Sequence, residues 1–566
     1  MEEIFLSDHG ILPGTDIAGQ LNAIFLQNPQ DTTFHFEPGV YHLYPQSAAP
    51  FSVSLSNSDQ LPVLKAGLLL SNMRNIRIVG HGSMLLSHGQ LSPLALINSS
   101  GISIDGLAID YSPTHNGEGV ILKSTPEWVD VSVDKTKYPY EIQGEHLFFW
   151  NGEEYTPYFG AIEFDATTRR TAYLTGDKFR SKRQEEVAEG VIRFHGRFDP
   201  LPTAGNFLTL RFSPRIHPGI LVHHCLDVSL DNIALFNTCG LGILTQFSRN
   251  LHYSRIAMLP NEEAGRHVVS CHDDGLHFSN NAGKISVDGC SFRGLMDDPI
   301  NVHGTAIRIS KITGPRSLIA EFAHDQSAAF PLWAETGDEV SLIEHNAMNS
   351  IDTLKVESFE LLSGNTCELI FASGLPSQLK PGDALENLNN TPEVDIRNCY
   401  FGSCRARGIL VSTPRKVVIE NNVFESSGSA ILIPGDANQW FESGACKDVT
   451  IRNNHFTDGC LISMYQFCEG IISICPEIPA PEADKPFHEK IRIEENTFHV
   501  FDAPVLYALS VKGLTFQNNT VIRSFAYKPW HPHRAMATLK ACTDVRIEDN
   551  KFVGDVLSTE VVQDML

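Results

Sequence analysis

With 566 residues the chain is too long for one ordinary globular core, so it forms either several domains or one elongated repeat structure. Its 42 Gly and 31 Pro residues, together with many Asn-Asn and Asp-Gly pairs, exclude long helices over most of the chain and favour an all-β protein. A formal charge of -24 argues against nucleic acid and anionic membranes as partners, and no stretch approaches the roughly 20 apolar residues of a membrane span.

The N-terminal segment predicts a short helix followed by extended chain. Thr15 and Asp16 precede an apolar pattern with helical spacing and are suited to cap it. The pattern consists of Ile17, Leu21, Ile24 and Phe25. We expect this helix to cover the first edge of the β structure that follows, because an open edge invites pairing with other chains.

A six-residue phrase recurs along the chain, with an apolar residue, a polar turn that contains Asn or Cys, and a final Phe. The clearest copies begin at Val287, Ile396, Ile419, Ile451, Ile493 and Ile547, and looser copies begin at Phe516, Ile104 and Leu230. Each phrase predicts a short strand, a tight turn and a second short strand. The phrase is therefore interpreted as one corner of a repeating coil.

The spacing of these phrases sets the length of the coil. Cys399 and Asn422 are 23 residues apart, and so are Asn496 and Asn519. One coil cannot bury its inner face alone, so successive coils must stack with like residues at the same corner. The sequence therefore predicts an all-β fold, a right-handed parallel β-helix of the pectin-lyase-like solenoid type.

Two intervals between phrases are much longer than one coil and indicate insertions. Cys290 and Cys399 are 109 residues apart, and Leu107 and Ile233 are 126 apart. Both insertions alternate apolar and polar residues, which predicts two small antiparallel β-barrel-like modules. The expected organisation is an N-terminal cap with the first coils (1–115), module 1 (116–215), coils with paired aspartates (216–304), module 2 (305–389) and C-terminal coils (390–566).

Two neighbouring coils carry an Asp-Asp pair directly before the same strand. The pairs are Asp273-Asp274 and Asp297-Asp298, and Asp274 and Asp298 are 24 residues apart, about one coil. The pairs are therefore expected one rung apart, about 4.8 Å along the stack. The polar residues predicted to surround them and to bind substrate are His272, Asp273, His277, Asn301, His303 and Arg407.

Stacked carboxylates are electrostatically unfavourable, because like charges raise each other's pKa and favour protonation of one group. Folding gains nothing obvious from this arrangement. General acid/base catalysis, however, requires a protonated carboxyl group beside an ionised one. The two Asp-Asp pairs therefore predict a catalytic site.

The phrase His272-Asp-Asp-Gly-Leu-His277, followed one coil later by Met296-Asp-Asp-Pro-Ile-Asn-Val-His-Gly304, resembles the bacterial exo-α-1,3-galactosidases of glycoside hydrolase family 110. The resemblance extends over most of the chain. It implies an inverting enzyme that removes terminal α-1,3-linked galactose, as in blood group B or linear α-galactosyl epitopes. It also implies that Asp274, Asp297 and Asp298 are the functional aspartates, without assigning acid and base.

The same resemblance implies a secreted or periplasmic enzyme, although Met1–Leu12 lacks the basic start and apolar run of a signal peptide. The expected partner is a glycan with terminal α-galactose, with no nucleic acid and no membrane. The sequence is also compatible with a homo-oligomer. No cofactor and no metal are predicted. Calcium is the main rival use of clustered carboxylates, but no further oxygen-rich ligand set follows them.

Two other functions remain as alternatives. A β-helical pectin-type hydrolase or lyase also uses paired aspartates, but the Gly-His-Gly and Arg-x-Lys sequences expected for a uronate substrate do not follow here. A glycan-binding β-helix without catalytic activity, as in phage tailspikes, would leave the Asp-Asp pairs unexplained.

Overall fold

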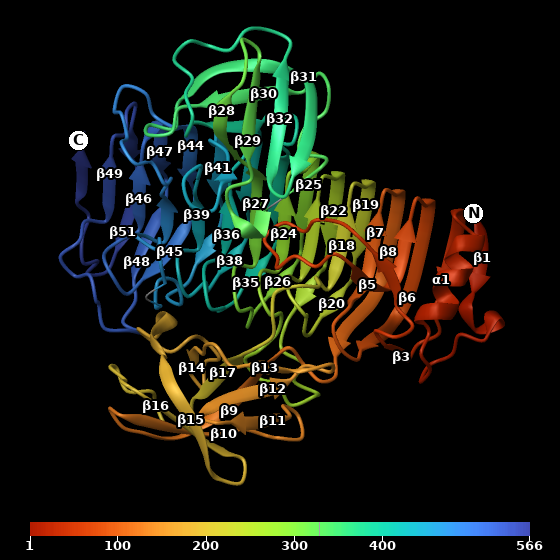
Figure 1. The fold of residues 1–566 in the computed structure, drawn as a ribbon. Coiled ribbons are helices and arrows are strands. Elements are labelled where there is room, and N and C mark those ends of the chain that lie inside the picture. Colours follow the sequence, from red (N-terminus) through yellow and green to blue (C-terminus); the bar gives the residue numbers. More distant parts are fainter. Residues whose placement is uncertain (328, 464, 566) are drawn as a thin grey trace.

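The structure, a computed structural model, describes residues 1–327, 329–463 and 465–565. Within these residues, two long sheets of 23 and 14 strands run along the molecule, and almost all of their pairings are parallel. Their strands are successive coils of one elongated solenoid, with the two chain ends at opposite ends of the stack (Figure 1). The predicted all-β fold and its right-handed parallel β-helix are therefore confirmed.

One pair of coils illustrates the repeat. The first coil contains β34 (Glu393–Arg397), β35 (Tyr400–Phe401) and β36 (Ile409–Val411), and the next contains β37 (Lys416–Glu420), β38 (Val423–Phe424) and β39 (Ile431–Ile433). Strand β34 pairs with β37, β35 with β38 and β36 with β39, all in parallel. The tight turn between β34 and β35 falls at Asn398, whose φ of 56° lies in the left-handed region that Asn tolerates.

Most of the remaining strands of the two long sheets occupy equivalent positions in other coils, whereas β4 and β40 pair antiparallel with β5 and β27. Those of the 23-stranded sheet are β1 (Glu2–Phe5), β2 (Gln30–His35), β3 (Val40–Leu43), β6 (Arg74–Ser87), β8 (Ser100–Tyr111), β19 (Leu226–Asp231), β20 (Ala234–Leu235), β22 (Arg249–Ser254), β23 (Ala257–Met258), β25 (Ala282–Asp288), β26 (Ser291–Phe292), β41 (Asp448–Arg452), β42 (His455–Phe456), β44 (His488–Glu494), β45 (Thr497–Val500), β47 (Val511–Gln517), β48 (Thr520–Arg523), β50 (Arg546–Glu548) and β51 (Lys551–Val553). Those of the second sheet are β4 (Ala49–Phe51), β5 (Leu64–Ser71), β7 (Ser92–Ile97), β18 (Ile220–His223), β21 (Ile243–Gln246), β24 (Leu276–Ser279), β27 (Ile300–Thr305), β40 (Glu442–Ser443), β43 (Ile472–Ile474), β46 (Leu506–Leu509), β49 (Ala537–Lys540) and β52 (Val561–Asp564).

The recurring Asn forms a ladder through the C-terminal coils. Asn454 Oδ1 accepts hydrogen bonds from both the backbone N–H and the side-chain Nδ2 of Asn422, at 3.0 Å each. Asn496 and Asn519 repeat the same pair of contacts two coils further on. Because each buried amide satisfies a backbone N–H at the corner, the ladder sets the register of the coils.

The recurring Phe forms a second stack beside the ladder. The rings of Phe401, Phe424, Phe456 and Phe498 lie parallel, with centroids 4.5 to 4.9 Å apart. All four are fully buried in the continuous core of the solenoid. The repeat predicted from the sequence therefore corresponds to stacked side chains inside one core.

The N-terminal helix α1 (Ala18–Gln27) packs over the first coil, and its predicted apolar face is buried. The expected capping is only half correct: Asp16 Oδ1 accepts a hydrogen bond from Ala18 N at 3.2 Å, whereas the Thr15 hydroxyl donates to Leu12 O instead. None of the helices in the described part of the chain is long and apolar enough to span a membrane. Three short 3-10 helices complete the helical content: η1 (Leu6–His9), η2 (Gly176–Lys178) and η3 (Asp325–Ser327).

Both insertions form antiparallel β modules that project from the middle of the solenoid (Figure 1). Module 1 has a six-stranded sheet, β14-β17-β9-β10-β16-β15, and a three-stranded sheet, β11-β12-β13, around its own core. Their bounds are β9 (Asn116–Ser124), β10 (Trp128–Ser132), β11 (Tyr140–Gln143), β12 (His146–Trp150), β13 (Tyr155–Pro157), β14 (Glu163–Phe164), β15 (Ser181–Ala188), β16 (Val191–Gly196) and β17 (Phe207–Arg211).

Module 2 is a closed six-stranded barrel in the order β28-β29-β32-β31-β30-β33. Its strands are β28 (Ile307–Ile312), β29 (Ser317–Glu321), β30 (Glu339–Ile343), β31 (Ser350–Ser363), β32 (Thr366–Phe371) and β33 (Ala384–Asn387). The fully buried Trp333 lies in its separate core. Each module therefore has a hydrophobic core of its own and interrupts the solenoid without ending it.

Replacing Asn454 by Ala should lower the free energy of unfolding by about 2–3 kcal/mol, because the backbone N–H of Asn422 and the backbone oxygen of Ile419 lose buried partners. Asn550→Ala is the matched control: Asn550 occupies the half-exposed end of the ladder, where water can replace the amide. Denaturant midpoints measured by circular dichroism compare the two. Equal midpoints would contradict a role of the ladder in stability.

Candidate active site

The register of two strands brings the Asp-Asp pairs together. Strand β24 pairs in parallel with β27, with Leu276 opposite Ile300, and Gly275 N donates to the backbone oxygen of Asp298 at 2.9 Å. One side-chain oxygen from each of Asp274, Asp297 and Asp298 lies within 4.8 Å of the others. The expectation that the pairs lie one rung apart is confirmed.

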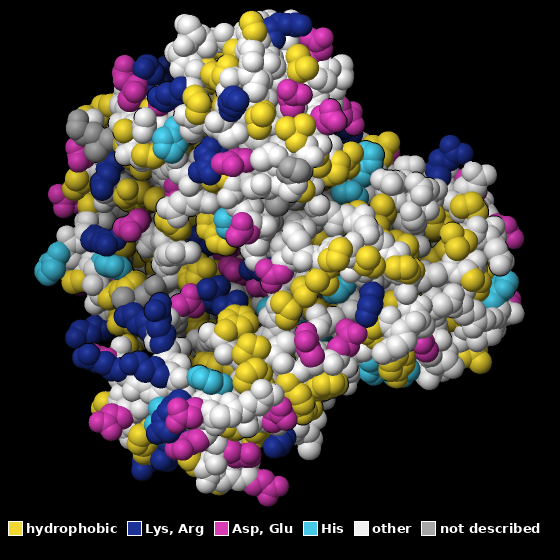
Figure 2. Space-filling view, viewed as in Figure 1, with side chains coloured by type: hydrophobic (Ala, Val, Ile, Leu, Met, Phe, Trp, Pro, Cys, Tyr) yellow, Lys and Arg dark blue, Asp and Glu magenta, His cyan; other side chains and the backbone are white. Residues whose placement is uncertain are grey.

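These three aspartates line a small cavity of about 100 Å³. Figure 2 shows acidic and basic side chains gathered in the hollowed middle of this face, between the two modules. Of the predicted substrate-binding residues, Asn301 and Arg407 also line the cavity. The other lining residues include several that the sequence did not indicate, among them Asn57, Arg215, Trp440, Glu442 and Tyr465.

Asp298 is fixed by Arg407 from the next coil. Its Oδ1 accepts hydrogen bonds from the backbone N (2.8 Å) and Nε (3.1 Å) of Arg407, and its Oδ2 accepts one from Nη2 at 2.8 Å. Burial raises the pKa of Asp298 to about 7, with Arg407 opposing the shift and the charges of Asp297 and Asp274 adding to it. A carboxyl group with this pKa can give or take a proton near neutral pH.

Asp297 and Asp274 each present one oxygen to the cavity. Asp297 Oδ2 accepts hydrogen bonds from Arg215 (3.1 Å) and Arg405 (3.3 Å), and Asp274 Oδ2 lies 2.7 Å from His277 Nδ1. Their Oδ1 atoms have no hydrogen-bond partner among the described residues. Burial, and next the charge of Asp297, raise the pKa of Asp274 well above its ordinary value. At neutral pH the cluster therefore holds a carboxylic acid beside a carboxylate.

Four predicted substrate-binding residues, His272, Asp273, His277 and His303, do not line this cavity. His272 and Asp273 are buried behind it: His272 Nδ1 lies 2.6 Å from Asp273 Oδ2, and Asp273 accepts a hydrogen bond from Arg215 at 2.7 Å. Against the effect of burial, Arg215 and His272 lower the pKa of Asp273. The pair therefore anchors Arg215, and neither side chain is placed to reach a sugar.

His277 and His303 are also buried behind the cavity, at 0% and 2% exposure. Both point out of the solenoid, but strand β40 pairs antiparallel with the end of β27 and covers them. The sequence could not predict this cover, because Glu442 and Ser443 of β40 lie about 140 residues after β27.

The residues that the sequence did not indicate bring positive charge and aromatic surface to the cavity. Arg215 is the last residue of module 1, and Arg405 lies two residues before Arg407, a spacing that could have identified it. The guanidinium groups of Arg405 and Arg407 lie 5.0 and 5.1 Å from the ring centroid of Tyr465. Nothing in the sequence around Glu442 or Tyr465 indicated a role.

The three aspartate oxygens are close enough together to hold a metal ion. However, Arg215, Arg405 and Arg407 already donate to Asp297 and Asp298, so the negative charge that would bind a cation is compensated by guanidinium groups. Calcium also takes six to eight oxygen ligands. The donor set fits proton transfer better than a metal site.

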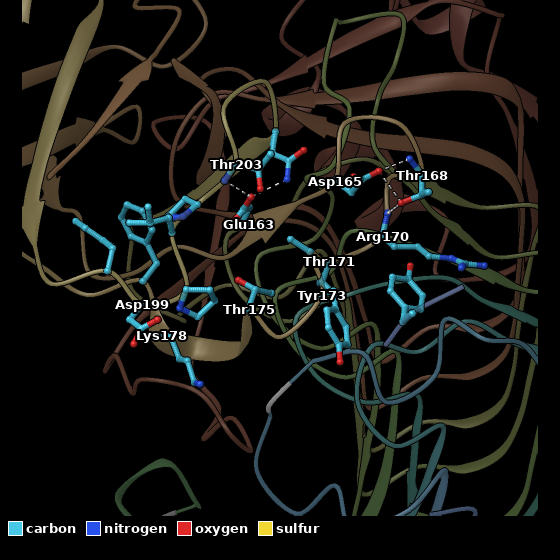
Figure 3. A pocket seen from close by; sticks show the side chains of 18 of the residues that line it. Glu163, Asp165, Thr168, Arg170, Thr171, Tyr173, Thr175, Lys178, Asp199 and Thr203 are labelled. Atoms are coloured by element: carbon cyan, nitrogen blue, oxygen red, sulfur yellow. Dashed lines mark hydrogen bonds between the residues drawn. The ribbon is translucent and has the colours of Figure 1, made fainter. Parts of the chain in front are cut away.

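A larger cavity of about 550 Å³ lies between module 1 and the C-terminal coils (Figure 3). Two of its carboxyl groups are held by structural hydrogen bonds: Glu163 accepts from Thr203 N and Asn206, and Asp165 accepts from Thr168. The paired aspartates do not line this cavity, and it is therefore not the candidate active site.

A parallel β-helix with an acid and a carboxylate side by side in a small cavity defines a glycoside hydrolase as the class of protein. Three family models match the chain: GLAA-B beta-barrel domain I over residues 117–208, GLAA-B beta-barrel domain II over residues 317–385, and a right handed beta helix region over residues 385–556.

Among curated relatives, alpha-1,3-galactosidase B of Bacteroides thetaiotaomicron is 41% identical, over 98% of this chain and 91% of that protein. Alpha-1,3-galactosidase A of Bacteroides fragilis is 34% identical, over 91% of this chain and 86% of that protein. The chain belongs to the α-1,3-galactosidase family, and the resemblance predicted from the sequence is confirmed. A solved structure, the tailspike protein of bacteriophage HK620, is 10% identical with a TM-score of 0.42, over all of this chain and 78% of that one.

Removing the guanidinium group in Arg407→Met should raise the pKa of Asp298 above 7, because Arg407 is the group that opposes the effect of burial. The limb of the pH profile of kcat/KM near pH 7 should then move to higher pH. Arg415→Met is the control, since Arg415 donates to Thr391 and Leu388 instead. An unchanged limb in Arg407→Met would mean that Asp298 does not govern the profile.

Proposed function

We propose that the protein is an exo-acting, inverting glycoside hydrolase that releases terminal α-1,3-linked galactose, with Asp274, Asp297 and Asp298 as its acid and base. The observation that carries the proposal is the cluster of three carboxyl groups within 4.8 Å, in which Asp274 and Asp298 have raised pKa values. The similarity to relatives named alpha-1,3-galactosidase supports an α-1,3-linked galactoside as the substrate.

In this mechanism one carboxylic acid gives its proton to the glycosidic oxygen as the bond to C1 breaks. A carboxylate takes a proton from a water molecule, whose oxygen attacks C1 from the opposite face. The products are free galactose in the β configuration and the shortened glycan. Arg215, Arg405 and Arg407 hold the carboxyl groups in place while one negative charge passes between them.

Exo action is supported by the shape of the cavity. It is small, about 100 Å³, and it is closed by side chains from β40, from the loop at Tyr465 and from the N-terminal loop at Asn57. Such a pocket suits the end of a glycan better than an internal unit. We extend the proposal to blood group B and linear α-galactosyl ends, and to a secreted or periplasmic location, on the family resemblance.

Inversion is supported by the family resemblance and not by the distance between the carboxyl groups. Carboxyl groups of inverting enzymes are usually about 6.5–9.5 Å apart, whereas the oxygens here lie within 4.8 Å of one another. A bound sugar and its attacking water would have to separate the groups. The stereochemistry of the first product therefore needs its own test.

Proton NMR of the sugar formed first from an α-1,3-galactoside should show β-galactose, which then mutarotates. Blood group B trisaccharide and the linear trisaccharide with terminal α-1,3-galactose are the two substrates to compare. Initial α-galactose would establish retention and reject the inverting mechanism. Cleavage inside a longer glycan would separately reject exo action.

Asp274→Asn, Asp297→Asn and Asp298→Asn should each lower kcat by about 10²–10⁴-fold, because each removes a group that transfers or stabilises a proton. The variant of the acid should keep most of its activity on an aryl α-galactoside whose leaving group needs no proton, whereas the variant of the base should not. Asp288→Asn, on the solenoid surface away from the cavity, is the control. Near-normal turnover in any of the three would remove that residue from the mechanism.

A further inference from the structure

Behind the cavity, two buried histidines form a chain of hydrogen bonds that begins at Asp274. His277 Nδ1 lies 2.7 Å from Asp274 Oδ2, and His277 Nε2 lies 2.9 Å from His303 Nε2. His303 Nδ1 lies 2.7 Å from the backbone oxygen of Gly304. The two rings are 5.0 Å apart and nearly perpendicular, so each nitrogen is directed at its partner.

The positions of the protons follow from the chemistry of these atoms. A carbonyl oxygen only accepts, so His303 Nδ1 must carry a proton. Burial, and next the neighbouring His303, lower the pKa of His277 well below its ordinary value, so His277 is neutral and carries one proton. Only one of the two facing Nε2 atoms can carry the proton between them. These conditions leave two arrangements.

In the first arrangement Asp274 is a carboxylic acid that donates to His277 Nδ1, and His277 Nε2 donates to a neutral His303. In the second, Asp274 is a carboxylate that accepts from His277 Nδ1, and the cationic His303 donates from Nε2 to His277. The arrangements contain the same number of protons. One passes to the other when the Asp274 proton moves to His277 Nδ1 and the His277 Nε2 proton moves to His303.

The surroundings favour the two arrangements in opposite directions. The carboxylates of Asp273, Asp297 and Glu442 face Asp274 and favour its protonated form, while Arg215 opposes them. Glu442 Oε1 lies 3.9 Å from His303 Nε2, so a negative charge stands beside the His303 end of these hydrogen bonds. Glu442 itself is held by Asn57 and Asn301, and although burial opposes it, the two histidines and these amides keep its pKa below the ordinary value.

We propose that His277 and His303 are positioning residues that relay a proton between Asp274 and the far end of these hydrogen bonds, where His303 lies beside Glu442. The relay would set the protonation state of Asp274 during turnover. This inference rests on the proposed function, in which Asp274 is one of the reacting carboxyl groups. The histidines themselves do not touch the sugar, because neither lines the cavity. The other charged groups near the chain are Asp298, on the same turn as Asp297, and Arg407, which is paired with it.

His303→Gln is the test variant. The amide of Gln can donate to Gly304 O and accept from His277 Nε2, but it cannot take up a proton, so only the first arrangement remains. The pH limb governed by Asp274 should move upward by about one unit, whether Asp274 acts as acid or as base. We expect kcat on the disaccharide substrate to fall about 10-fold or more, and KM to stay within about threefold, because the cavity wall is unchanged.

His488→Gln is the matched control. His488 is equally buried, and its Nδ1 accepts from Cys446 N in a coil away from the aspartates. It should lose stability without a change in the pH profile. If His303→Gln matches this control, with kcat within twofold of the wild type and the same pH profile, the relay is rejected.

A measurement on the unmodified enzyme covers the case in which His303→Gln does not fold. In mixtures of H2O and D2O, a relay predicts a curved dependence of kcat on the deuterium fraction for the disaccharide, because two protons move together. A straight line would overturn the relay. Asp274→Asn separates the two proposals: full activity there would reject the proposed function, whereas its loss together with a normal His303→Gln would reject the relay alone.

Discussion

Parallel, in-register stacking of the coils governs both the core of the solenoid and its candidate active site. Each coil places its residues directly over those of the coil before it, so like residues meet at a spacing of about 4.8 Å. For Asn454 and Phe456 this contact is favourable, because amides hydrogen-bond and rings stack along the axis. For Asp274 and Asp298 the same geometry brings like charges together, and these charges add to the effect of burial, which is the main cause of their raised pKa values. The scaffold thereby forces carboxyl groups into the proximity that catalysis uses.

The stack of carboxyl groups is tolerated because arginines from distant segments of the sequence form ion pairs with it. Arg215, Arg405 and Arg407 donate to the aspartates from the end of module 1 and from the following coil. Removing one partner of such a buried pair is costly, since it leaves an uncompensated charge. The site is therefore one electrostatic unit, and the histidines behind Asp274 belong to it as much as the residues that line the cavity.

The inserted modules take part in building this unit. Asp177 of module 1 accepts hydrogen bonds from Arg405, at 2.9 Å from Nε and 2.6 Å from Nη2, and so orients the arginine that contacts Asp297. His324 of module 2 stacks on Trp440, a wall of the cavity, at 4.3 Å. A bare solenoid would leave an open groove along these coils. Contacts from both sides turn the groove into a pocket, and the two modules that make them are the regions matched by the two GLAA-B beta-barrel models.

The solenoid, the two insertions and the one-rung distance between the Asp-Asp pairs follow from the sequence, because a repeat of fixed length leaves only one register for stacked coils. The places of Asn301 and Arg407 follow from the same register. That His277 and His303 lie behind the cavity, and that Glu442, Tyr465 and Asn57 complete it, is known only from the folded chain. Glu442, Tyr465 and Asn57 come from segments outside the repeat, where separation along the sequence does not set distance in space. They cover the paired aspartates, and burial is the main cause of the raised pKa values of Asp274 and Asp298.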